Sequence, residues 1–208
     1  MDIVGHRGAC GHAPENTLKS FAKAIELGCQ RVELDVHLSK DKIPVVIHDP
    51  TVDRTTNGAG AVRELILEEL KRLNAGEGEQ IPTLLEVMNV CRGRVDLQIE
   101  LKGKNTPRPV AAITQEHWDP KRAVITSFDL SLLDQFSSLM PEVPSGLLSG
   151  DSALDLVGLA EAHGHVWICP RFNIVTTELV RKAHAANLLV YVYHVNVRQT
   201  ADKLVEWG

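Results

Sequence analysis

The chain has 208 residues, 44% of them apolar, and a formal charge of −5 at neutral pH. Its length and apolar content favour one globular domain over residues 1–208, and its acidic balance gives no electrostatic basis for binding nucleic acid or inserting stably into a membrane. No apolar run approaches the ~18 residues of a membrane span, and a strand-like run follows Met1 without room for a secretion signal. Because the four cysteines are widely spaced, we expect free thiols and a cytoplasmic location.

Short β-like runs alternate with helical patterns along the whole chain. This alternation predicts an α/β fold of βα units around a parallel sheet. We expect seven barrel strands, at Asp2–Gly5, Arg31–Leu38, Val95–Lys102, Ala123–Phe128, Ser145–Leu148, Val166–Cys169 and Leu189–Asn196.

The clearest helix signals lie in the first half of the chain. Asn16 or Thr17 is expected to cap a helix whose apolar stripe runs from Leu18 to Ile25 and which stops at Gly28. A capping box, Thr83-x-x-Glu86, predicts the start of another helix. Two further helical stretches are expected near residues 161–165 and 177–187.

The second and third predicted strands separate apolar from polar side chains with a period of two. On the second strand, Glu33, Asp35 and His37 share one face, opposite Val32, Leu34, Val36 and Leu38. On the third, Glu100 and Lys102 belong to the polar face. In a barrel the polar faces point inward, where unpaired carboxylates cost several kcal/mol each. Glu33, Asp35 and Glu100 would supply three hard oxygen ligands, which suit Mg²⁺ or Ca²⁺; the alternative is a half-solvated edge with outward charges.

His48 follows Asp35 too closely for a helical crossover, so residues 45–48 are expected to return antiparallel to the second strand. A tight turn centred on Asp41-Lys42 pairs positions whose numbers sum to 83, which places His48 opposite Asp35 on the same face. A slip of one residue would turn His48 away, and Lys42 is a poor residue for the positive φ of such a turn.

His6 directly follows the first strand, at the end where barrel enzymes carry their sites. Two histidines that flank a metal can serve as general acid and base because they titrate near neutrality. Arg7 and Lys102 would supply fixed positive charge for phosphate oxygens. Together these residues suit a metal-assisted attack on a phosphate ester.

Several motifs occur along the chain in a characteristic order. They are His6-Arg7-Gly8, Pro14-Glu15-Asn16-Thr17, Glu33-x-Asp35, His48-Asp49, Asp53-Arg54-Thr55-Thr56-Asn57-Gly58, Ile81-Pro82-Thr83-Leu84 and Glu100-Leu101-Lys102. With these motifs the chain resembles the glycerophosphodiester phosphodiesterase family over essentially its full length. The resemblance implies a TIM (β/α)₈-type barrel in which residues 50–80 form a small cap insertion rather than a barrel unit.

The resemblance also implies an enzyme that hydrolyses small glycerophosphodiesters to sn-glycerol 3-phosphate and an alcohol, with a divalent metal such as Mg²⁺ or Ca²⁺. By motif position, the implied metal ligands are Glu33, Asp35 and Glu100, the acid/base pair is His6 and His48, and the phosphate contacts are Arg7 and Lys102. Either water or the substrate's own glycerol hydroxyl is the nucleophile.

The chain departs from the family pattern in two places. In the seventh strand Tyr193-His194-Val195-Asn196 stands where the family usually has tryptophan before Thr-Val-Asn. After Trp207-Gly208 the sequence stops where related chains enter an eighth strand, so we expect the last strand and helix to be absent from this chain. An incomplete or truncated chain is favoured over a gap filled by another chain.

Two other functions compete with this one. A lysophospholipase D or sphingomyelinase D-like enzyme would use a similar histidine pair and metal, but residues 51–80 contain no Phe, Tyr or Trp, which favours small polar substrates over lipids. A catalytically weak phosphodiester-binding barrel is the third possibility, although all seven proposed functional residues are present. The sequence carries no signal for the leaving alcohol or the oligomeric state.

Overall fold

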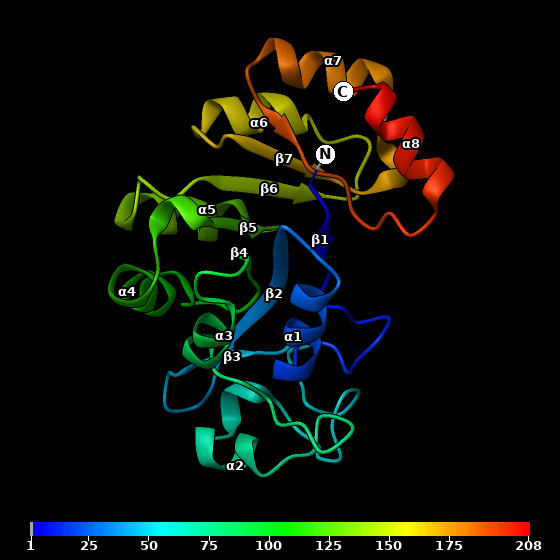
Figure 1. Cartoon of the computed structure of the whole chain (residues 1–208). Coiled ribbons are helices and arrows are strands. Elements are labelled where there is room, and N and C mark those ends of the chain that lie inside the picture. The colour runs from blue at the N-terminus through cyan, green and yellow to red at the C-terminus, as the bar shows by residue number, and fades with distance from the viewer. Residues whose placement is uncertain (1) are drawn as a thin grey trace.

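The computed structural model describes residues 2–208 and contains a curled parallel sheet with helices on its outer side (Figure 1). The strands of this sheet, in spatial order, are β1 (Val4–Gly5), β2 (Arg31–Leu38), β4 (Asp96–Leu101), β5 (Ala123–Ser127), β6 (Ser145–Ser149), β7 (Trp167–Pro170) and β8 (Leu189–Val190). All seven predicted barrel strands are present, and each neighbouring pair is parallel.

The first and last barrel strands form the two ends of the sheet. Within residues 2–208, β1 pairs only with β2 and β8 only with β7. The predicted α/β barrel lacking its last strand is therefore confirmed. The seventh predicted strand is shorter than expected, because ordered pairing stops at Val190 and continues only as a single bridge between Arg171 and Tyr193.

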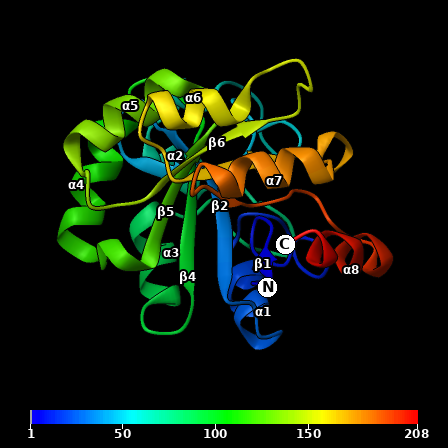
Figure 2. The same ribbon diagram turned by 90° about the horizontal axis from the view of Figure 1, so that it is seen from above.

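Helices follow the strands around the outside of the sheet, as Figure 2 shows from above. They are α1 (Leu18–Glu26), α3 (Leu84–Cys91), α4 (Pro107–His117), α5 (Leu130–Leu139), α6 (Leu156–Ala162), α7 (Thr177–Ala185) and α8 (Arg198–Glu206). Thr17, not Asn16, caps α1 by accepting a hydrogen bond from the Ser20 amide. The predicted capping box of α3 is confirmed, since Thr83 and Glu86 each accept from the other's backbone amide. None of the described helices has both the length and the apolar character needed to span a bilayer.

The two faces of β2 are used as the alternation predicts. Its apolar side chains, with those of β4, are buried against α1 and α3 in the main core, which includes Val32, Leu34, Val36, Phe21, Leu84 and Leu97. Its polar side chains Glu33 and Asp35 are also buried, on the inner side of the sheet. Burial of both faces fits the central position of β2 between two parallel neighbours.

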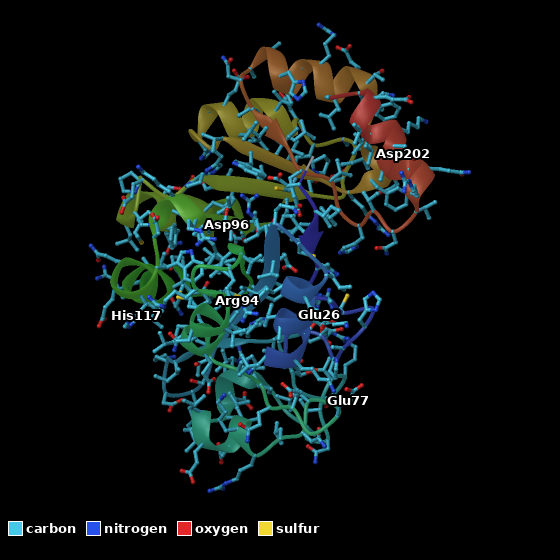
Figure 3. The ribbon with its side chains drawn as sticks, viewed as in Figure 1. Glu26, Glu77, Arg94, Asp96, His117 and Asp202 are labelled. Atoms are coloured by element: carbon cyan, nitrogen blue, oxygen red, sulfur yellow. The ribbon has the colours of Figure 1, made fainter. Side chains whose placement is uncertain are left out.

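Residues 50–80, called the insertion below, lie between β3 and α3 and bury apolar side chains in a cluster separate from the main core. The insertion contains a 3₁₀ turn at Val62–Glu64 and the short helix α2 (Leu67–Lys71), and it lies next to the end of the sheet where β2 pairs with β3 (Pro44–Val46) in Figure 1. Its apolar side chains bury together with those of β3 and the following residues, the set being Val45, Ile47, Val52, Val62, Leu70, Ala75 and Ile81. An ion pair of 2.6 Å between Lys19 on α1 and Glu77, labelled in Figure 3, joins the insertion to the barrel.

The predicted antiparallel return of β3 along β2 is confirmed, but the predicted register is wrong by one residue. Val36 pairs with Val46 and Leu38 with Pro44, so paired numbers sum to 82. The connection is a three-residue loop, and Lys42 adopts φ +68° at its last position. A three-residue hairpin places a left-handed residue there, which shifts the register relative to a two-residue turn.

His48 nevertheless reaches the inner side of the sheet, because the regular pairing ends before it. The last ladder hydrogen bond runs from the Ile47 amide to the Asp35 carbonyl at 3.0 Å. The chain then turns, and His37 Nε2 donates to the His48 carbonyl oxygen at 3.1 Å. Strand parity therefore does not decide where the His48 side chain points.

The left-handed Lys42 gives a direct test of this hairpin. Lys42→Gly relieves a conformational cost of about 1–2 kcal/mol and adds about 0.5–1 kcal/mol of unfolded-chain entropy, so we expect the free energy of unfolding to rise by about 0.5–1 kcal/mol. The matched variant Lys40→Gly, at a loop position without positive φ, should lower it. Urea denaturation measures both, and equal destabilisation by the two variants would contradict the hairpin described.

Candidate active site

The candidate site lies at the carboxyl ends of β1, β2 and β4. Glu33 and Asp35 come from β2 and Glu100 from β4, and the parallel register sets Asp35 directly beside Glu100. Carboxylate oxygens of these three buried residues all lie within 4.8 Å of one another. His6 and Arg7 directly follow β1, and the Arg7 amide donates to Glu33 Oε2 at 2.9 Å. Strands distant in sequence thus bring one acidic cluster together.

The acidic cluster is only partly neutralised by protein cations. Burial, together with repulsion from Asp35 and Glu100, raises the pKa of Glu33 well above its usual value. Burial and the charge of Asp35 raise the pKa of Glu100 to about 7. Lys102 Nζ lies 3.0 Å from Glu100 and 3.6 Å from Asp35, while Arg7 Nε lies 3.5 Å from Asp35. The cluster would therefore be stabilised by further positive charge, from protons or from a cation.

Asn16 completes the surroundings of Asp35. Its Nδ2 donates to Asp35 Oδ2 at 2.9 Å, and its Oδ1 is buried without a hydrogen-bond partner in residues 2–208. Its backbone adopts φ +58°, a left-handed conformation that asparagine tolerates better than most residues. The sequence predicted Asn16 only as a possible helix cap, although its place in a family motif signalled a further role.

His48 has a partner at each ring nitrogen. Nδ1 lies 2.5 Å from Asp49 Oδ1, and Nε2 lies 3.2 Å from Lys102 Nζ. A carboxylate accepts and an ammonium donates, so these partners assign the proton of a neutral His48 ring to Nδ1 and make Nε2 the acceptor of a hydrogen bond from Lys102.

His6 is held between the acidic cluster and a third histidine. Its Nε2 lies 4.0 Å from Glu33 Oε2 and 2.8 Å from His194 Nε2, with the two rings 4.0 Å apart. Burial, followed by the charges of His194 and Arg7, lowers the pKa of His6 to about 4. Its Nδ1 lies 3.6 Å from the thiol of Cys10. His194 was not among the predicted site residues, and its departure from the family pattern was the only signal in the sequence.

Two aromatic side chains lie beside Lys102 at the edge of the site. Phe128, in the loop after β5, is 53% exposed, and its ring meets the edge of Tyr193 at 6.0 Å. Lys102 Nζ lies 5.9 Å from the centre of the Phe128 ring. Both aromatic residues come from loops that follow barrel strands, whereas the sequence-based prediction considered only residues 51–80, which contain no Phe, Tyr or Trp.

Two carboxylates and an arginine form an outer layer that sequence reasoning did not assign. Arg54 donates to both oxygens of Asp49 at 2.6 and 3.1 Å, and to both oxygens of Glu15 at 3.0 and 2.7 Å. Glu15 also accepts from Arg7 Nη1 at 2.8 Å. Hydrogen bonds from Arg54, and then from His48, hold the pKa of Asp49 well below its usual value. Each residue belongs to a motif identified above, which was the available signal.

The structure brings all seven predicted site residues into one continuous set of contacts. The linked residues are His6, Arg7, Glu33, Asp35, His48, Glu100 and Lys102. The arrangement combines oxygen donors for a hard cation, two fixed cations and two imidazoles. Such a set can bind a phosphate diester and move protons to and from its oxygens.

Comparisons with known proteins agree with this chemistry. The family model described as glycerophosphoryl diester phosphodiesterase family matches residues 6–208. A glycerophosphodiester phosphodiesterase of Caldanaerobacter subterraneus subsp. tengcongensis is 33% identical, over 99% of this chain and 90% of its own length.

Solved structures extend the likeness to the fold. A phosphodiesterase of Oleispira antarctica, in complex with the product sn-glycerol-3-phosphate, superposes with a TM-score of 0.95 at 31% identity, covering 100% of this chain and 90% of that chain. A glycerophosphodiester phosphodiesterase of Agrobacterium tumefaciens gives a TM-score of 0.88 at 29% identity, over 99% and 92% of the two chains. With a site of this composition and relatives that match along its whole length, the chain belongs to the glycerophosphodiester phosphodiesterase family of enzymes.

Proposed function

We propose that the protein catalyses metal-dependent hydrolysis of small glycerophosphodiesters to sn-glycerol 3-phosphate and an alcohol. The observation that carries the proposal is the convergence of three buried carboxylates, two cationic side chains and two histidines at the strand ends. The product bound in the Oleispira relative supports the glycerol phosphate half of the substrate. Four free cysteines support a cytoplasmic location, and the main core that joins α1 to α7 supports a single domain.

Glu33, Asp35 and Glu100 would hold the divalent metal. The raised pKa values of Glu33 and Glu100 indicate carboxylates crowded together with too little positive charge, so the cluster fits a cation. Carboxylate oxygens are hard donors, which favours Mg²⁺ or Ca²⁺ over Zn²⁺. When bound, such an ion polarises the phosphoryl group and offsets the charge that develops on its oxygens.

Arg7 and Lys102 would bind the non-bridging oxygens of the phosphate. Both cations already lie within 4 Å of Asp35, at the edge of the acidic cluster. Arg7 is oriented by Glu15, and its planar guanidinium suits bidentate recognition of a phosphate. Charge placed at fixed positions in this way requires little reorganisation as the reaction proceeds.

His48 and His6 would move the protons. The contacts of His48 leave Nε2 unprotonated, so once Lys102 binds the phosphate this nitrogen would take the proton of the attacking hydroxyl, whether it belongs to water or to the glycerol of the substrate. His6, with His194 Nε2 at 2.8 Å, would then exchange a proton with the leaving alcohol. Its pKa of about 4 is lower than the near-neutral value expected from the sequence, and the negative charge of a bound phosphate diester would raise that pKa toward the range this role needs. Asp49 holds the His48 ring in this tautomer, as a carboxylate does in other histidine sites.

The exposed aromatic rim supports a second candidate, a lysophospholipase D-like activity. Phe128 lies beside Lys102, where an apolar part of a larger substrate could pack. We expect Phe128→Ala to lower turnover of lysophosphatidylcholine at least tenfold if that activity exists, and to leave turnover of glycerophosphocholine within about twofold. Parallel assays of the two substrates decide between them, and an absence of lysophosphatidylcholine cleavage by the wild type eliminates the second candidate.

The main proposal is tested by release of glycerol 3-phosphate from glycerophosphocholine. We expect activity with added Mg²⁺ or Ca²⁺, loss of activity in excess chelator, and a fall in kcat of about 10²–10⁴-fold in His48→Ala. The control His117→Ala, on α4 and away from the site (Figure 3), should retain wild-type activity. Undiminished activity of the chelated protein or of His48→Ala would overturn the mechanism.

The charge of the acidic cluster predicts a second, independent measurement. The pKa of Glu100 rises on folding from about 4.5 to about 7, so the folded protein holds this proton more tightly than the unfolded chain does. The resulting stabilisation is complete at pH values below about 4.5 and is lost as the pH rises to about 7. In chelator, Glu100→Gln should therefore raise the free energy of unfolding at pH 8 by on the order of 1–3 kcal/mol, and have little effect at pH 5. Urea denaturation at both pH values tests this, with the exposed Glu116→Gln as control. An effect independent of pH would contradict the assignment.

A further inference from the structure

Arg54 connects two of the proposed functional residues without contacting the acidic cluster itself. One arm runs from Arg54 through Asp49 to Nδ1 of His48, and the other runs through Glu15 to Nη1 of Arg7. Four hydrogen bonds of 2.6–3.1 Å join the Arg54 guanidinium to the two carboxylates. A single side chain of the cap insertion therefore lies between the proposed base and a proposed phosphate ligand.

The ion pairs of Arg54 with Asp49 and Glu15 are partly exposed to solvent, so they orient their partners more than they stabilise the fold. The Arg54 side chain is 48% exposed, whereas Asp49 and Glu15 are 24% and 21% exposed. Ion pairs at such exposure contribute little to stability, typically below about 1 kcal/mol. Bidentate contacts do restrict the rotation of a carboxylate, so Arg54 determines which oxygen Asp49 presents to His48 and which Glu15 presents to Arg7.

The joint between the insertion and the barrel is tightly packed at this point. A cavity of about 10 Å³ beside it is lined by Glu15, Asn16, His48 and Thr55, among others. A space of this size holds at most about one water molecule. Glu15 and His48 therefore lie next to residues of the insertion with room for little more than one water molecule between them.

We propose that Arg54 is a positioning residue, which aligns His48 through Asp49 and Arg7 through Glu15 and so makes the seated cap insertion a condition of full activity. This inference rests on the proposed phosphodiesterase function for its kinetic consequences. Its structural consequence, the tautomer and orientation of His48, does not depend on that function. The two consequences can therefore be measured separately.

The kinetic test uses one variant for each arm, assayed with glycerophosphocholine and metal. Asp49→Asn should lower kcat with little change in KM, because it disturbs the proposed base. Glu15→Gln should mainly raise KM, because it releases a phosphate ligand. Arg54→Gln should do both, by about 10–100-fold in kcat/KM. The double variant Arg54→Gln with Asp49→Asn should lose less than the product of the two single losses, since both act on one chain of contacts.

Three controls distinguish a positioning role of Arg54 from an effect on folding and from an effect of its positive charge alone. Arg63→Gln removes an arginine of the same insertion that is 82% exposed, and it should leave kcat and KM unchanged. Arg54→Lys keeps the charge but cannot bridge both carboxylates, so it should restore only part of the activity. Urea denaturation of each variant establishes that the protein remains folded at the assay temperature.

The tautomer of His48 provides the readout that needs no turnover. Imidazole ¹⁵N shifts of the wild type should report that the neutral form of the His48 ring carries its proton on Nδ1, and Arg54→Gln should raise the share of the form protonated at Nε2. The positioning role would be overturned if the wild type is active and folded Arg54→Gln has the same kcat, KM and His48 ¹⁵N shifts as the wild type. If the wild type hydrolyses no glycerophosphodiester, the proposed function fails, and the ¹⁵N shifts alone still decide whether Arg54 positions His48.

Discussion

Three carboxylates buried together inside the barrel are the constraint around which the surrounding groups are arranged. Glu33, Asp35 and Glu100 lie within 4.8 Å of one another, and repulsion between buried anions is too costly to leave unanswered. The loop after β1 directs the Arg7 guanidinium toward Asp35, and Lys102, directly after β4, lies beside the same carboxylate. What looks like a list of separate functional residues is therefore one electrostatic unit, in which each cation is held by the anions it faces.

The parts of the structure that depend on local geometry could be predicted from the sequence. Side chains alternate along a strand with a period of two, so the apolar and polar faces of β2 and β4 followed from the order of residues alone. The capping box of α3 was equally readable, because its two hydrogen bonds are local. The two faces of residues 31–38 and the capping box of residues 83–86 could be predicted without reference to the rest of the chain.

The parts that depend on loops or on distant segments could not be predicted. Lys42 adopts a left-handed conformation that its residue type disfavours, so the hairpin register was off by one. His48 still reached the site because pairing stops before it, which no periodicity argument anticipates. His194 meets His6 across a separation of 188 residues, and Arg54 meets Glu15 across 39, so both contacts exist only once the barrel and its insertion have formed.

The distribution of the site along the chain divides the enzyme into two regions that can change at different rates. Every proposed metal ligand, phosphate ligand and proton-transfer residue comes from positions 6–102, together with the insertion that braces them. The later strands supply the wall instead, in Phe128 and Tyr193. Substitutions at Phe128 and Tyr193 would change this wall while every proposed metal and phosphate ligand stays in place. In this architecture the proposed chemistry and the wall around the substrate can therefore change separately.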